Sequence, residues 1–314
     1  MASAQVQTRD QTSRTSGTAR VVGLLVYAVG LTVGVQVWGL PKSTVAAFAC
    51  VWLAVIAWDN RAPWRDHLAF PRDWALPLAV LVVYLYSRGL ADDLGLTPVQ
   101  VTSPIEADRL LFGGTLPTEY LQARLCGEPC VRTLPREWYD VPLTTVYYSH
   151  FFVAPIVAGV LWVRHRPSWV HFMRRYLTIN IAALAVFVAL PVAPPWLAAH
   201  QGELSGIARI TGRGWYELGP GDFQEQFSAV GNPVAAMPSL HAGIALLVAL
   251  YAISRLSSPW RWLVLLYPLT MSFALVYFAE HYVVDTLGGW LLALGVWWGC
   301  AVWERRVGPQ PDTT

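Results

Sequence analysis

Long apolar stretches decide the fold of this chain, and the clearest is Val283–Trp303, which reads VVDTLGGWLLALGVWWGCAVW. The stretch contains one charged residue, Asp285, close to its start. About 20 predominantly apolar residues form a helix long enough to cross the hydrocarbon core of a bilayer. The stretch therefore predicts a membrane-spanning helix with its acid near one membrane surface.

The composition of the whole chain agrees with a membrane protein. Of its 314 residues, 55% are hydrophobic and 13% charged, against roughly 25% charged residues in soluble domains. Many of the 16 Trp residues lie at the ends of apolar stretches, where their rings suit the headgroup level. The net charge of +2, without a long basic run, indicates that nucleic acid is not a partner.

Apolar segments recur along the sequence and predict an all-α, polytopic membrane helix bundle of about eight spans. Several segments are shorter than a full span, so the expected number is six to eight, and the second segment could be re-entrant. No second domain is indicated, which predicts a single membrane domain over residues 21–306. The segments are Val21–Leu40, Thr44–Trp58, Trp74–Leu90, Leu143–Val163, Tyr176–Leu190, Leu240–Ile253, Trp262–Ala279 and Val283–Trp303.

The positions of the Arg residues predict the orientation, because cytoplasmic loops collect Lys and Arg. With eight spans, the Arg clusters all fall on one side of the membrane. They lie before the first span, after the second, fourth and sixth spans, and after the last. Both termini are therefore predicted to be cytoplasmic in an integral protein of the cell membrane. Residues 1–20 are predicted to be a disordered cytoplasmic tail, and residues 307–314 a short one.

Two long polar segments, Ala91–Pro142 and Trp196–Pro238, would then lie outside the cytoplasm. Irregular loops of this length are uncommon unless they bind something, so we expect two structured extracytoplasmic loops that cap the bundle. Cys126 and Cys130 lie in the first of them, where an oxidising compartment would allow a disulfide. Free thiols are the alternative, and no further ligands are spaced for a zinc site.

Polar residues that could take part in catalysis gather at the extracytoplasmic ends of the predicted spans. Charged side chains within spans are costly and therefore informative. Glu280 is interpreted as a solvated neighbour of the others, and His150 either touches the site or lies at the membrane interface. The group comprises His150, Ser239, His241, Glu280, His281 and Asp285.

The spacing of His281 and Asp285 predicts a paired imidazole and carboxylate, since residues four apart share a helix face. The carboxylate would fix the tautomer of the imidazole and leave its other nitrogen basic. Such an imidazole can attack phosphorus, while a second imidazole, His241, protonates the leaving oxygen. This chemistry needs no metal and no cofactor, and its rate should fall at both pH extremes.

The segment Ala236–Gly243 reads as the start of a helix, with Pro238 in a favourable position and Ser239 as an added hydroxyl donor. Free backbone amides at such a start bind anions. A phosphate held there would meet His241 one turn further into the helix.

These residues resemble the type 2 phosphatidic acid phosphatase superfamily. Its motif Pro-Ser-x-His is similar to Pro238–His241, and the latter half of its Ser-Arg-x5-His-x3-Asp motif to His281–Asp285. Ala274 and Leu275 occupy the Ser-Arg positions, and the motif Lys-x6-Arg-Pro is not evident. The run Pro191–Trp196 and the form His-Tyr-x-x-Asp resemble the branch that contains inositol phosphorylceramide synthase.

The resemblance implies a catalytic core in roughly residues 143–303. It also implies that His281 is the nucleophile, Asp285 its orienting partner, and His241 the acid and then the base. Ser239 would help to hold the phosphate. Arg209 and Arg213, in the second outer segment, are candidates for the cations that the missing motifs would have supplied.

The predicted function is a membrane phosphotransferase that acts through a phosphohistidine and moves a phosphoinositol-like headgroup to a hydroxyl acceptor. Its substrate would be a phospholipid or a polyprenyl phosphate. The alternative is a phosphatase that hydrolyses phosphatidic acid or polyprenyl phosphate. Two more distant alternatives are an intramembrane serine hydrolase using Ser239, and a transporter, whose polar groups would usually lie near the midplane of the bilayer.

Overall fold

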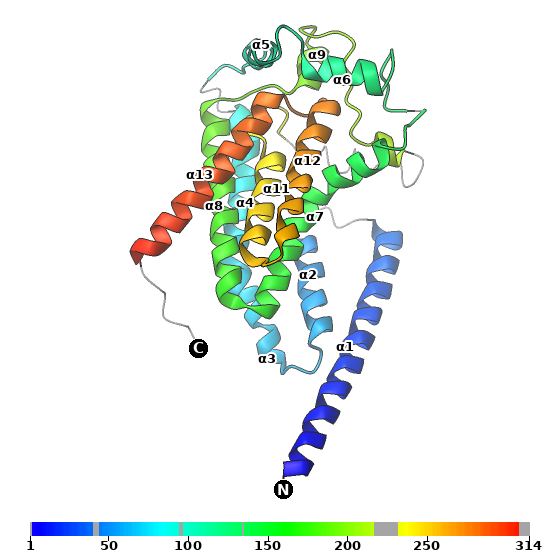
Figure 1. Ribbon diagram of the computed structural model, residues 1–314, viewed down its shortest axis with the longest axis vertical. Coiled ribbons are helices and arrows are strands. Elements are labelled where there is room, and N and C mark those ends of the chain that lie inside the picture. The colour runs from blue at the N-terminus through cyan, green and yellow to red at the C-terminus, as the bar shows by residue number, and fades with distance from the viewer. Residues whose placement is uncertain (1, 40–43, 94–96, 134, 217–231, 308–314) are drawn as a thin grey trace. The chain divides into compact units, whose positions relative to one another are not determined.

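The computed structural model describes residues 2–39, 44–93, 97–133, 135–216 and 232–307 (Figure 1). Within these ranges the regular structure is helical. The described residues also contain two isolated β-bridges, Gln100 with Val192 and Val192 with Ala235. The prediction of an all-α fold is confirmed.

The chain divides into two compact units. One comprises Met1–Val82 and Pro155–Arg166, and the other Val83–Ala154 and Pro167–Thr314. The sequence predicts one membrane domain and does not indicate this division. Apolar composition marks which helices can cross a bilayer, but it carries no information on which of them pack together.

The first unit is built from N-terminal helices. Phe70 stacks on Phe48 and on Trp74, with ring centroids 5.1 and 5.0 Å away. A Cβ atom at Gly23 would lie 2.6 Å from the carbonyl oxygen of Ala57, so two of these helices touch through their backbones. The elements are α1 (Ala2–Trp38), α2 (Thr44–Trp58), α3 (Trp64–His67) and parts of α4 (Ala69–Asp93) and α7 (Asp140–Arg164).

Helix α1 begins at Ala2 and so includes residues for which the sequence predicts a disordered tail. Extending an existing helix costs less than starting one, because nucleation is the unfavourable step. The apolar candidate span within α1 is Gly17–Trp38. The disorder of residues 2–20 stays a prediction, and the predicted tail at 307–314 lies outside the described residues except for Val307, the last residue of α13 (Val283–Val307).

The second unit contains a group of long helices and, at one end of them, a cap of short ones. Figure 1 shows α5, α6 and α9 gathered at the end where α12 finishes and α13 begins. The long helices are α8 (Arg166–Ala189), α11 (Leu240–Arg255), α12 (Leu266–Tyr277), which follows the 3-10 helix η2 (Pro259–Leu265), and α13. The cap contains α5 (Thr102–Leu111), α6 (Pro117–Leu125), α9 (Pro195–His200) and the 3-10 helix η1 (Arg213–Trp215).

Six helical segments of the described chain are long and apolar enough to cross a membrane, and two shorter apolar helices accompany them. The predicted number of six to eight spans is confirmed. The segment Tyr176–Leu190, which looked short in the sequence, belongs to the longer helix α8. The six are Gly17–Trp38, Trp64–Ser87, Asp140–Arg164, Arg166–Ala189, Pro259–Tyr277 and Val283–Val307, and the shorter two are Val45–Trp58 and Leu240–Arg255.

Helices α11 and α13 approach each other closely at two glycines. A Cβ atom at Gly289 would lie 2.2 Å from the backbone oxygen of Ser239, and one at Gly243 would lie 2.8 Å from that of Gly289. A side chain at either position would push the helices apart. The glycines therefore allow the beginnings of α11 and α13, where the candidate site residues lie, to touch.

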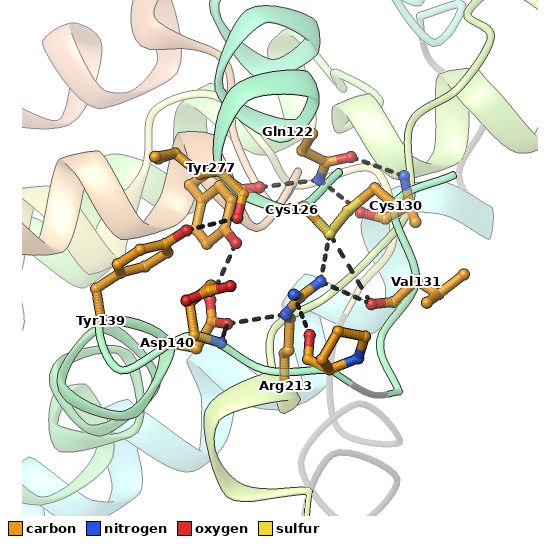
Figure 2. Close-up of a disulfide and its surroundings, with 12 residues drawn as sticks. Gln122, Cys126, Cys130, Val131, Tyr139, Asp140, Arg213 and Tyr277 are labelled. Carbon is orange, nitrogen blue, oxygen red and sulfur yellow. Dashed lines mark hydrogen bonds and ion pairs between the residues drawn. A yellow bond between two sulfur atoms is a disulfide. The ribbon is translucent and has the colours of Figure 1, made fainter. Parts of the chain in front are cut away.

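The cap is joined to the long helices by a buried polar network around a disulfide (Figure 2). Cys126 and Cys130 are bonded to each other, as the sequence predicted. Arg213 Nε donates to Asp140 Oδ2 at 2.8 Å, and the Tyr277 hydroxyl donates to Asp140 Oδ1 at 2.9 Å. Gln122 donates to the backbone oxygen of Tyr277 at 2.9 Å. Contacts from α6, α7, η1 and α12 thus meet in one cluster.

Candidate active site

The beginnings of α11 and α13 are joined by a direct backbone hydrogen bond. The N–H of Ser239 donates to the carbonyl oxygen of Asp285 at 2.9 Å. The Ser239 hydroxyl accepts from the N–H of Ala242 at 3.4 Å and caps α11, as Ser commonly does. Ser239 is fully buried. The two sequence motifs, more than 40 residues apart, therefore form one structural unit.

His281 and Asp285 form the pair that the sequence predicts. The Nδ1 atom of His281 lies 3.5 Å from Oδ2 of Asp285, and both residues are buried. Asp285 Oδ2 also accepts the backbone N–H of Tyr282 at 2.9 Å, which fixes the carboxylate at the start of α13. Since Nδ1 faces the carboxylate, Nε2 is the ring nitrogen available for chemistry.

His241 lies beside this pair, with its ring centroid 5.9 Å from that of His281. His150 also belongs to the cluster, because its ring centroid is 4.1 Å from that of His241. Of the two interpretations that the sequence left open for His150, the structure favours contact with the site. His150 is therefore a direct neighbour of His241, the candidate acid and base.

Two aromatic residues of the cluster were not identified from the sequence. Tyr147 stacks on the His241 ring at 5.1 Å, and Phe151 meets it edge-on at 5.8 Å. With His150 they have the i, i+3, i+4 spacing of one helix face. That spacing was visible in the sequence, but only the structure shows that this face of α7 covers His241.

Glu280 is not the solvated residue that the sequence suggested, because it is 8% exposed and paired with Arg209. Arg209 Nε and Nη2 donate to the two carboxylate oxygens at 2.6 and 3.0 Å, and the Thr211 hydroxyl also donates to this carboxylate. The guanidinium lies over the Trp196 ring. Burial lowers the pKa of Arg209, but Glu280, together with Tyr147 and Tyr148, raises it above its ordinary value.

The structure places Arg209 and Arg213 differently, although both are predicted to bind phosphate. Arg209 is 28% exposed and is paired with the residue directly before His281. Arg213 is buried in the disulfide network, where it donates to Asp140 and to the backbone oxygens of Val131 and Pro135. These contacts favour a structural role for Arg213, and its role as a phosphate ligand stays an untested prediction.

The arrangement suits phosphoryl transfer between two imidazoles. Reacting atoms must approach to about 3–3.5 Å, and rings whose centroids are 5.9 Å apart can contact one phosphoryl group together. Among the described residues, no group of three or more His, Cys, Asp or Glu side chains could hold a metal ion. The expectation of catalysis without a metal stays a prediction.

Comparison with known proteins identifies the family of the chain. The profile of the PAP2 superfamily matches residues 128–299, more than half of the chain. The chain belongs to this superfamily. The match includes His150, His241, His281 and Asp285 but not the cap helices α5 and α6.

Curated relatives give a more particular resemblance. A phosphoinositol dihydroceramide synthase of Bacteroides thetaiotaomicron is 25% identical over 71% of this chain and 74% of the relative. The inositol phosphorylceramide synthase catalytic subunit of Schizosaccharomyces pombe is 29% identical over 87% of this chain. The chain covers 61% of that relative's length. No solved structure gives a significant match.

The family and the apolar helices together define the class of protein. It is a membrane enzyme of the phosphatidic acid phosphatase type that acts on lipid phosphates, as a phosphotransferase or a phosphatase. The predicted resemblance to the inositol phosphorylceramide synthase branch is confirmed.

Proposed function

We propose that this protein transfers a phosphoinositol-like headgroup from a phospholipid to the hydroxyl group of an acceptor lipid. The observation that carries the proposal is the meeting of His241 with the His281–Asp285 pair at the capped end of the second unit. The names of the two relatives described above, a phosphoinositol dihydroceramide synthase and an inositol phosphorylceramide synthase catalytic subunit, favour transfer over hydrolysis.

The reaction would proceed in two displacements at phosphorus. In the first, Nε2 of His281 attacks, an N–P bond forms, and the P–O bond to the diacylglycerol oxygen breaks as that oxygen takes a proton from His241. In the second, His241 accepts the proton of the acceptor hydroxyl, whose oxygen forms a new P–O bond while the N–P bond breaks. Asp285 holds His281 throughout and offsets the positive charge of the imidazole.

The site should also contain a cation for the phosphate, and Arg209 is the better placed of the two predicted arginines. It is partly exposed, and its partner Glu280 precedes the nucleophile. Arg209→Ala should lower kcat/KM by about 10²-fold, the size expected for a lost charged contact to a phosphoryl group. Arg209→Lys should recover part of that loss, because it keeps the charge without the paired geometry. Equal kcat/KM in the wild type and Arg209→Ala would remove Arg209 from the site.

We further propose that the site faces the extracytoplasmic side, with both termini in the cytoplasm. Arg clustering on the opposite side of the predicted topology supports this orientation. The disulfide between Cys126 and Cys130 lies in the cap beside the site and supports an oxidising compartment.

Cysteines placed singly at 203 and at 306, in a background without the native cysteines, should react with an impermeant maleimide in intact cells only at 203. Labelling only at 306 would reverse the orientation.

The experiment that tests the proposed function is turnover by the purified protein in detergent. The substrates are labelled phosphatidylinositol, phosphatidic acid and polyprenyl phosphate, each with and without ceramide as acceptor. Acceptor-dependent transfer that His281→Ala and His241→Ala both abolish supports a synthase. Release of free phosphate from phosphatidic acid, lost in the same variants, would make the protein a phosphatase. Activity that survives both substitutions would contradict the site.

The serine-hydrolase alternative has its own test. The Ser239 hydroxyl accepts a backbone N–H as the cap of α11, so Ser239→Ala should weaken turnover without abolishing it. Complete loss with Ser239→Ala, in protein that stays folded, would favour Ser239 as the nucleophile.

A further inference from the structure

A carboxylate from the cap contacts the helix that carries Asp285. Asp108, on α5, accepts the backbone N–H of Val283 through Oδ2 and that of Val284 through Oδ1, both at 2.9 Å. Its side chain is fully buried, at 0% exposure. Asp108 lies outside the residues that the superfamily profile matches. The contact therefore ties the cap to the short segment between His281 and Asp285.

The same face of α5 also contacts the side chain that lies between the two motif residues. Tyr282 is fully buried in an apolar cluster with Ile105. Ile105 and Asp108 are three residues apart and so share a helix face. Helix α5 thus shares an apolar cluster with Tyr282 and accepts hydrogen bonds from the backbone that follows it. The other buried members of the cluster are Leu116, Ala198 and Leu204.

The N–H groups at the start of a helix have no partner within the helix. At the start of α13, the N–H of Tyr282 donates to Asp285, while those of Val283 and Val284 donate to Asp108. Two carboxylates therefore divide these amides between them. Negative charge at this position also interacts favourably with the helix dipole.

This division affects the catalytic pair. Oδ1 of Asp285 is buried and has no hydrogen-bond partner among the described residues. Without Asp108, the partly buried amides of Val283 and Val284 would lose their acceptor, which is costly. Asp285 is the carboxylate closest along the helix that could rotate to accept them, and that rotation would take Oδ2 away from His281.

We propose that Asp108 is a positioning residue for the reaction: by occupying the first amides of α13, it keeps Asp285 directed at His281. The proposal rests on the proposed function, in which His281 is the nucleophile. It assigns a mechanistic task to helix α5, which lies outside the residues that the superfamily profile matches.

The first test measures hydrogen exchange at the start of α13 in the intact protein in detergent. In Asp108→Ala, a peptide that covers residues 280–290 should exchange about tenfold faster at the amides of Val283 and Val284, because each loses a charge-assisted hydrogen bond. Glu106→Ala is the matched control, since Glu106 lies on the same helix and is exposed. Unchanged exchange in Asp108→Ala would overturn the proposal.

The second test separates positioning from general stability by kinetics, with turnover expressed per folded molecule. Asp108→Ala should lower kcat about 10- to 100-fold, the loss expected from a small displacement of a catalytic group, with KM changed less than about threefold. Asp108→Asn should recover much of the loss, because its amide oxygen still accepts one N–H. If Asp108→Ala fails to fold, kcat is compared between Asp108→Asn and the wild type instead. Wild-type kcat in Asp108→Asn and Asp108→Ala alike would overturn the proposal.

A double-mutant cycle with Asp285→Asn shows through which residue Asp108 acts. If Asp108 acts by directing Asp285, then Asp108→Ala should have little further effect on kcat in the Asp285→Asn background. Additive losses would mean an independent structural role and would overturn the proposal. His281→Ala in the same assay distinguishes the two failures, because residual activity there would contradict the proposed function itself.

Discussion

The polar cluster at Arg213 and the polar cluster at His281 are both buried in the second unit, yet their hydrogen bonding differs. Nε, Nη1 and Nη2 of Arg213 each donate to an acceptor, and both carboxylate oxygens of its partner Asp140 accept hydrogen bonds. In the other cluster, His281 Nδ1 and Asp285 Oδ1 have no hydrogen-bond partner among the described residues.

This difference indicates a structural role for the Arg213 cluster and a chemical role for the His281 cluster. Buried polar groups are nearly always hydrogen-bonded, and a catalytic role is one of the explanations for an exception. Arg213 and Asp140 hold the cap to α7 and α12 (Figure 2), so their loss should affect stability. His281 and Asp285 lack such saturation, so their loss should affect turnover.

The largest expected effect is on the catalytic pair. His281→Gln should reduce turnover on the order of 10⁴-fold, because the nucleophile is removed, while the thermal unfolding temperature changes little. Asp285→Asn should also cause a large loss, because the amide no longer orients the imidazole or balances its charge. Stopped-assay turnover and a thermal melt of the same preparations measure both quantities. A large loss of stability without loss of turnover per folded molecule would mean that His281 and Asp285 have a structural role and not a catalytic one.

The next effect concerns the Arg213 cluster, in which the polar groups are hydrogen-bonded. Arg213→Ala leaves Asp140 buried without its cation and should lower the free energy of unfolding by about 3–5 kcal/mol. Turnover per folded molecule should stay within a few-fold of wild type. Denaturant unfolding in detergent measures the first quantity, and Arg124→Ala, an exposed substitution in the same cap, is the control. A raised KM in stable Arg213→Ala would instead place Arg213 at the substrate, as the sequence predicted.

A smaller loss of stability should follow from removal of the disulfide. Cys126 and Cys130 are separated by four positions, and closing so short a loop stabilises the folded chain by about 2 kcal/mol. Cys126→Ser combined with Cys130→Ser should therefore lower the free energy of unfolding by about that amount. Dithiothreitol should destabilise the wild type and leave the double variant unchanged. Equal sensitivity of both proteins to dithiothreitol would point to another cause.

The smallest effect concerns the pH dependence of the contact at Asp108. Burial raises the pKa of Asp108, the N–H groups of Val284 and Val283 oppose this, and the charge of Asp285 adds to it. A carboxyl group whose pKa is raised by folding binds more protons in the folded state than in the unfolded state. Its contribution to stability therefore falls as the pH rises from the pKa of the unfolded state through the raised pKa of the folded state. Asp108→Asn cannot titrate. The stability of the wild type relative to Asp108→Asn should therefore decrease across that window, as thermal melts at a series of pH values would measure. A relative stability that increases with pH would contradict the raised pKa.

Much of the candidate site could be predicted because its residues break a strong local rule. Histidine and aspartate are rare in apolar spans, so His241, His281 and Asp285 were visible against their surroundings. Glu280 could not be interpreted correctly in this way. It lies next to the motif, and its burial depends on Arg209, which is 71 positions away and reaches it only in the folded chain.

The sequence by itself determined the class of this protein. Apolar segments of bilayer length predict membrane helices whatever their neighbours are, because the bilayer acts on each segment separately. The motifs in residues 238–241 and 281–285 indicated the chemistry, because an i, i+4 spacing fixes a local geometry.

Only the tertiary structure decided how distant residues divide the work. It placed α7 against His241, gave Arg209 and Arg213 different surroundings, and brought Asp108 to the first amides of α13. These contacts join segments far apart in the chain, and no local pattern encodes them. The physical reason is that a buried charge or amide is satisfied by whichever partner the packing brings within hydrogen-bonding distance.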